Sequence, residues 1–329
     1  MLPLKKKQDK AGDEAAENEA MEEEEYSQSA IEKAKEAVIK ALDQNGNGQL
    51  EIEDLIILAL KTPGVHINRE EFLRKELFKN HTEEQINKAI ETRPAEAGIE
   101  SKEIDKIADE VIKAERIRVS GISAALGAPG GWAMAATLPA DIIQYYGCTL
   151  RVAQELLYLY GFPSLESGEN GLVLDSQTMN QLILCLGIMN AVAGANTAIK
   201  GMAKALAVGV EKKLLNAALT KGTFYPLVKA IAKWFGKNMT KTIFAGFFKK
   251  AIPVVGGVVG GGITFFTFKP CCTRLKKVLK DTKLSNPDHV STEEENAFVE
   301  SIIEGTIIDV DIDEITSAGD EAQEENAEE

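Results

Sequence analysis

Apolar side chains recur with the 3.6-residue period of amphipathic helices through most of the chain between residues 30 and 304. The pattern is clearest from Ile142 to Tyr160, directly after Pro139. Proline suits the first turn of a helix because the N–H that it lacks would be unpaired there. Gly161-Phe162-Pro163 is expected to end this helix. The pattern therefore predicts an all-α fold with a helical bundle core and at most one short strand.

Capping residues mark where several shorter helices begin. A side-chain acceptor followed three residues later by Glu or Gln is typical of a helix N-terminus. This pattern occurs at Ser29 with Glu32, Asn68 with Glu71, Thr82 with Gln85, and Thr292 with Glu295. Ser101 is expected to cap a further helix ahead of Ile104.

Three runs contain no Asp, Glu, Lys or Arg: 119–140, 176–199 and 251–268. Runs without charge are expected to be buried, in protein or in lipid. In the second run Gly187, Ala191 and Ala195 are four residues apart, a spacing that lets helix backbones approach closely. The third run contains five glycines and Pro253, so a buried glycine-rich helix or hairpin is favoured over a membrane span.

The twelve residues from Asp43 to Asp54 match the calcium-binding loop of an EF-hand, which supplies oxygens from positions 1, 3, 5, 7, 9 and 12. Gly48 stands at position 6, where the loop turns sharply, and the apolar Leu50 at position 8. The candidate metal ligands are Asp43, Asn45, Asn47, the carbonyl of Gln49, Glu51 and Asp54. The alternative is a polar turn between two helices.

The loop has neutral Asn at positions 3 and 5, and Asp54 replaces the usual Glu at position 12. Fewer charges and a shorter carboxylate predict a weak Ca²⁺ site, with a dissociation constant on the order of 10⁻⁵ to 10⁻³ M, or a preference for Mg²⁺. No second good loop follows. Residues 64–68 are a candidate metal-free partner strand for 49–51, which makes His66 structural.

Charge is unevenly distributed along the 329 residues, whose net charge is −14. Residues 200–290 hold 17 basic and 3 acidic side chains, a net +14, whereas residues 291–329 hold 15 acids and no Lys or Arg. The basic region, interleaved with Phe and Trp, is typical of a surface that meets anionic membrane. Nucleic acid is disfavoured by the net charge and by the lack of a recognised module. We expect the acidic tail to shield the basic region.

Catalytic motifs are missing from the sequence. The three histidines lie in polar connecting segments, and the four cysteines lack the spacing of a zinc site or a secreted disulfide framework. We expect all four thiols to be reduced. Asp141 is the only acid between Glu115 and Glu155, so it is either a functional carboxylate or half of a buried ion pair; the pair, with Arg151, Arg116 or Arg118, is favoured.

Four features between about residues 95 and 285 resemble the bacterial EcsC family. They are Leu138-Pro139-Ala140-Asp141, Arg151 ten residues further on, Leu159-Tyr160-Gly161-Phe162, and the glycine-rich segment from Ile252 to Gly261. The resemblance implies an all-helical, membrane-associated bacterial protein. It implies no reaction and no catalytic residues.

Together these patterns predict an N-terminal EF-hand helix-loop-helix, a helical core and disordered acidic termini. The predicted order is a disordered arm (1–28), the EF-hand (29–79), connecting helices (80–110), the EcsC-like core (111–290), a short helix (291–305) and a disordered tail (306–329). The start of the chain has lysines but no apolar segment behind them, so we expect a cytoplasmic protein, peripheral on the inner membrane or inserted there as a hairpin. The alternatives are a soluble helical scaffold that binds a protein partner and, least favoured, an enzyme.

Overall fold

The computed structural model describes residues 36–127, 134–165, 176–209, 226–236 and 256–304, apart from Ala37 and Asn45; for 123–127, 134–138, 176 and 256–267 it describes the backbone alone. The chain divides into two compact units, residues 1–49 and 50–329. The predicted disordered termini, the helix start at Ser29 and the lysines from 212 to 221 and from 237 to 250 lie outside the described residues.

In the first unit, residues 38–42 are helical, and the N–H of Asp43 donates to the carbonyl of Ile39 at 2.8 Å. The described residues of the second unit form helices joined by turns, with no strand assigned among them. The predicted all-α class is therefore confirmed for the part of the chain that the structure describes.

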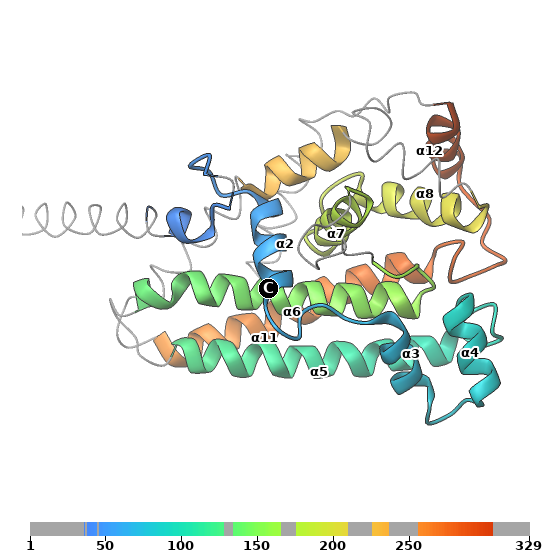
Figure 1. Cartoon of the computed structure of the whole chain (residues 1–329), viewed down its shortest axis with the longest axis horizontal. Helices are drawn as coiled ribbons and strands as arrows, with labels where there is room; N and C mark the ends of the chain where they lie inside the picture. Colours follow the sequence, from blue (N-terminus) through green and yellow to red (C-terminus); the bar gives the residue numbers. More distant parts are fainter. Residues whose placement is uncertain are drawn as a thin grey trace, which may run out of the picture. The chain divides into compact units, whose positions relative to one another are not determined.

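Three long helices form the centre of the second unit: α5 (Ser101–Gly127), α6 (Met134–Leu159) and α11 (Gly256–Lys280). They lie side by side, with α5 antiparallel to both others (Figure 1). Ion pairs fix the alignment of α5 and α11, because Lys276 meets Asp109 at 2.6 Å and Lys280 meets Asp105 one turn away. Aliphatic side chains at helical spacing on α5 are buried: Ile104, Ile107, Ala108, Val111, Ile112 and Val119.

The end of α6 follows the sequence prediction, but its start does not. Gly161 has a φ of 90°, and the N–H of Phe162 donates to the carbonyl of Leu157 at 2.9 Å, as in a Schellman motif. At the other end the helix begins at Met134, so Pro139 lies inside it and not at its start. A proline this near the N-terminus costs one backbone hydrogen bond, which packing between neighbouring helices can offset.

The short helices α2 (Ile52–Lys61), α3 (Arg69–Leu77) and α4 (Glu83–Glu91) pack beside this centre. Two predicted caps are confirmed: Asn68 accepts from the N–H of Glu71 at 2.9 Å, and Thr82 forms a capping box with Gln85. The prediction for α5 was one residue off. Ser101 is the first helical residue, and the carbonyl of Glu100 accepts the first helical hydrogen bonds.

Arg69 joins α3 and α4 to the end of α6. Its buried guanidinium donates to the carbonyls of Ala89, Ile90 and Thr92 at the end of α4 and to the carbonyl of Phe162 just after α6. The three acceptors at the end of α4 are carbonyl groups that a helix C-terminus leaves without an intrahelical partner, and a cation satisfies them well. Burial lowers the pKa of Arg69 from its ordinary value.

Residues 64–68, the candidate partner strand, are not assigned as a strand. Their backbone is held by a side chain of α6 instead. The amide of Gln154 accepts from the N–H of Ile67 at 3.1 Å and donates to the carbonyl of Val65 at 2.9 Å. Gln154 is fully buried, so it replaces the hydrogen bonds that a neighbouring strand would have supplied.

The uncharged run 176–199 forms two helices, α7 (Ser176–Met189) and α8 (Ala195–Ala207). Gly187, Ala191 and Ala195 therefore do not line one helix as their spacing suggested. Ala191 has a positive φ of 59° in the turn between them. Gly187 does allow a close approach, since a Cβ there would lie 3.1 Å from Ile231 in the helical segment 226–236.

The last described helix, α12 (Glu293–Glu304), packs on α8. Thr292 caps it as predicted, accepting from the N–H of Glu295 at 3.2 Å. Phe298 lies directly over Gly201 of α8, where a Cβ would come within 2.4 Å of the ring. Among the described helices, none combines the length and the apolarity needed to cross a bilayer.

Gly201→Ala should separate α12 from α8. The new methyl group would overlap the inner atoms of the Phe298 side chain, which cannot swing away without moving the helix. Overpacking of this kind costs about 1–3 kcal/mol. We expect faster amide hydrogen exchange in 293–304. Gly121→Ala is the control, because nothing lies within 4 Å of that Cβ and the change is expected to stabilise α5 slightly. Unchanged exchange in 293–304 would contradict the close packing.

Candidate functional site

The segment from Asp43 to Gln49 is folded around the Asp43 carboxylate. Oδ1 accepts from the N–H of Gly46 at 2.7 Å, and Oδ2 accepts from the N–H of Gly48 at 2.8 Å. The Asn47 side chain accepts from the N–H of Gln49 at 2.8 Å. Gly46 and Gly48 have φ values of 73° and 76°, which other residues adopt with strain. The loop thus gathers side-chain oxygens on one short stretch.

The two remaining candidate ligands lie at the start of α2. Glu51 is its N-cap residue, and Asp54 is buried in its first turn. The pKa of Glu53 between them is raised, first by burial and then by the charges of Glu51 and Asp54. The six candidate ligands fall in both units, and Asn45 lies outside the described residues. The described residues contain no group of three or more His, Cys, Asp and Glu arranged to hold a metal. Cation binding at this loop stays a prediction.

A second candidate site is buried where α5 and α6 meet. Arg151 of α6 binds Glu115 of α5 and Glu155 of its own helix, with N–O distances of 3.1 Å to each. Its guanidinium also donates to the carbonyl of Gly64. Arg118 of α5, whose side chain is half-exposed, has its Nε 3.6 Å from Oε1 of Glu115. We call Glu115, Arg151 and Glu155 the carboxylate cluster.

The carboxylate cluster contains more acid than base. The Glu115 and Glu155 side chains are 4% and 7% exposed, and the Oε2 atom of each is buried without a hydrogen-bond partner. The pKa of Glu155 is raised to about 8, first by burial and then by Glu115, while Arg151 opposes the rise. Near neutral pH Glu155 therefore holds a proton, which leaves one carboxylate to balance one guanidinium.

Arg151 is one of the partners predicted for Asp141, but its charged partners are Glu115 and Glu155. Asp141 is half-buried on α6. Sequence reasoning used Glu115 and Glu155 only as the ends of the acid-free interval and missed their role. One signal was present, since Arg151 and Glu155 are four residues apart and face each other on a helix. Glu115 gave no such signal, being 36 positions away.

All four thiols are free, as predicted. Cys148 and Cys272 are buried, and burial raises the pKa of each thiol above its ordinary value. Glu115 raises both pKa values further. Because the thiolate is the reactive form, these cysteines are poor nucleophiles.

Two of the three histidines, His81 and His289, lie beside carboxylates within the fold. His81 lies 3.2 Å from Glu103 at the start of α5. His289 lies between Asp281 and Glu295, with N–O distances of 3.3 and 2.8 Å, and so connects the end of α11 to α12. The pKa of Asp281 is lowered, chiefly by the hydrogen bond from Lys200 of α8.

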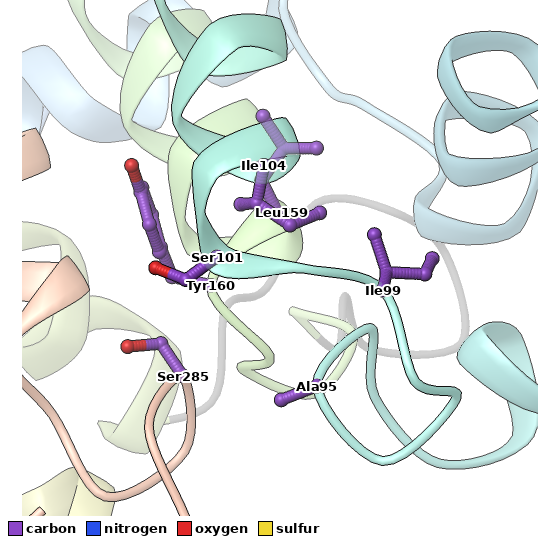
Figure 2. A pocket seen from close by; sticks show the side chains of 7 residues that line it. All are labelled: Ala95, Ile99, Ser101, Ile104, Leu159, Tyr160 and Ser285. Carbon is purple, nitrogen blue, oxygen red and sulfur yellow. The ribbon is translucent and has the colours of Figure 1, made fainter. Parts of the chain in front are cut away.

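A small cavity opens between the 95–99 turn, the start of α5, the end of α6 and Ser285 (Figure 2). Its volume is about 10 Å³, which holds one water molecule and no substrate. The Tyr160 side chain lines it and donates to Asp105 at 2.8 Å. This cavity gives no support to the enzyme alternative.

Comparisons with protein-family models, with curated proteins and with solved structures found no match. The resemblance to the EcsC family therefore rests on the sequence features quoted above and stays a prediction.

Glu155→Gln should change how stability depends on pH. A carboxyl whose pKa is about 8 when folded, against an ordinary 4.5, binds its proton more tightly in the folded state. The folded wild type therefore loses stability as pH rises through this interval, by at most about 1.4 kcal/mol per pH unit, and the Gln variant does not. Urea unfolding at pH 5, 6.5 and 8 measures this. Glu110→Gln, an exposed change on α5, is the control. Parallel curves for wild type and Glu155→Gln would show that Glu155 does not titrate there.

Proposed function

We propose that this chain is a helical, divalent-cation-binding protein that associates with anionic membrane through its basic region. The observation that carries the cation site is the loop around Asp43, in which glycine backbone N–H groups donate to the carboxylate and the side chain of Asn47 accepts from the backbone N–H of Gln49. A loop fixed in this way presents its oxygens with little ordering cost. Asp43, Asn45, Asn47, Gln49, Glu51 and Asp54 are the proposed ligands, and Ca²⁺ or Mg²⁺ the proposed ion.

Fewer of the positive charges in the basic region are available to bind a membrane than its composition suggests. Ten of its 17 basic residues lie in the described part, and at least six of these bind groups within the fold. The six are Lys200, Lys204, Arg274, Lys276, Lys280 and Lys283. This internal use of charge favours the alternative function, a helical scaffold for a protein partner. The membrane proposal therefore relies on exposed basic residues such as Lys233, Lys269 and Lys277.

The position of α12 supports the proposed shielding by the acidic tail. This helix carries five of the 15 acids after residue 290 and packs on α8, at the start of the basic region. Lys204 of α8 donates to Asn296, and Lys200 binds Asp281, which also contacts His289. The acidic segment therefore starts beside lysines, from where residues 305–329 can compete with lipid for positive charge.

Cation binding is tested by isothermal titration with Ca²⁺ and Mg²⁺ up to millimolar concentration. We expect Asp43→Ala to abolish binding, because it removes the carboxylate at position 1 of the loop. Asp54→Glu should tighten Ca²⁺ binding severalfold, since the longer side chain reaches the ion with both oxygens. Gln44→Ala, at a position that supplies no ligand, is the control. Wild-type protein without heat of binding, or equal binding by Asp43→Ala, would refute the site.

Removing residues 305–329 takes away ten acids and leaves α12 in place. We expect the truncated protein to bind anionic vesicles more strongly, because each lysine near such a surface contributes about 1 kcal/mol. Flotation at 0.1 and 0.5 M salt should show the gain at low salt only. A tail of equal length with Asn and Gln in place of its acids should behave like the truncation. Equal flotation of all three proteins at low salt would rule out shielding.

A further inference from the structure

The contacts of α5 place its neighbours in register. Asp109 meets Lys276 of α11, and Glu115 meets Arg151 of α6, with α5 antiparallel to both. Each step along α5 is therefore matched by a step back along α6 and α11. By this register Arg118 lies level with residue 267 of α11 and with Cys148 of α6. We call this the boundary level.

Beyond the boundary level the three helices carry almost no charge. The residues are 119–127 of α5, 134–147 of α6 and 256–266 of α11, and Asp141 is the only Asp, Glu, Lys or Arg among them. The intervening residues 128–133 and the preceding 251–255 are also uncharged in sequence. In Figure 1 the last turns of α5 and the first turns of α6 and α11 gather at the same end of the bundle. We call residues 119–127, 134–147 and 256–266 the charge-poor end.

Basic and aromatic side chains collect at the boundary level. Arg116 and Arg118 lie there on α5, and Lys269 lies there on α11. Tyr145 packs against Phe268 and against Tyr146, with ring centroids 6.4 and 5.6 Å apart. Ile117, between the two arginines, is 59% exposed. Basic and aromatic residues next to an uncharged stretch are the composition of a membrane–water interface.

The size of the charge-poor end limits how deeply it can enter a bilayer. Beyond the boundary level the nine residues of α5, fourteen of α6 and eleven of α11 correspond to helices of about 14, 21 and 17 Å, all shorter than the 30 Å hydrocarbon core. This agrees with the finding that no described helix can span. An end of this length can enter a bilayer from one side but cannot cross it.

We propose that the charge-poor end inserts into an anionic bilayer from one side, with Arg116, Arg118 and Lys269 at the level of the lipid headgroups. This rests on the proposed membrane association and names the element that inserts. Charge complementarity favours lipid over a second copy of the chain, because two copies meeting through this end would bring their basic residues together.

The experiment uses full-length protein and vesicles of phosphatidylcholine with 30% phosphatidylserine, floated in about 1 M salt. High salt screens the attraction of surface lysines and leaves insertion intact. Gly121 is exposed beyond the boundary level, with nothing within 4 Å of a Cβ, so it tolerates larger side chains. We expect Gly121→Glu to lower the bound fraction roughly fivefold, because a charge must enter the apolar layer. Gly121→Leu should raise it, and Gly121→Ala should change it little.

Ala114→Glu is the matched control, since Ala114 is exposed on the same face of α5, two turns before Gly121 and on the other side of the boundary level. It should bind as wild type does. Circular dichroism melting checks that all variants are folded.

If wild type floats at low salt only, and Gly121→Glu floats equally, insertion is wrong while the proposed membrane association stands. If wild type never floats, both are wrong. If Gly121→Glu changes only the sedimentation of lipid-free protein, the end is an interface between copies.

Discussion

The centre of the structure depends on the ion pairs and hydrogen bonds that the guanidinium of Arg151 forms. This guanidinium binds a carboxylate on each of two long helices and the backbone carbonyl of Gly64, so one side chain aligns α5, α6 and the segment before α3. Because Glu155 holds a proton near neutral pH, loss of the guanidinium would leave the buried Glu115 carboxylate without this partner, a defect that costs about 3–5 kcal/mol. The proton on Glu155 completes the balance and makes the junction sensitive to pH.

Buried polar side chains attach the shorter elements to this centre. Arg69 donates to carbonyls at the end of α4 and just after α6, and Gln154 bonds to the backbone of Val65 and Ile67. In each case a side chain supplies the hydrogen bonds that regular structure leaves open. The polar N-terminal helices and the apolar bundle are thus joined by hydrogen bonds whose loss would leave buried groups unpaired.

Charge also varies along the axis of the three long helices. At one end Asp105 and Asp109 of α5 bind Lys280 and Lys276 of α11, so basic residues serve to hold the helices together. At the other end charges are nearly absent, and the interior of the bundle must rely on apolar packing. A bundle built in this way has one end suited to water and one end suited to a less polar surrounding, which is the physical basis for expecting contact with lipid.

The sequence alone determined features that depend on neighbours within a few residues: the caps at Asn68, Thr82 and Thr292, and the helix end at Gly161. The candidate cation loop is a prediction of the same local kind, because its proposed ligands lie within twelve residues. The tertiary structure alone decided the pairing of Arg151 with Glu115, the clamp at Arg69 and the start of α6 ahead of Pro139. These features join positions tens of residues apart or depend on packing, and a single sequence carries no record of which distant side chains meet. The all-helical class was predictable because the 3.6-residue period is local, whereas the register of the bundle was not.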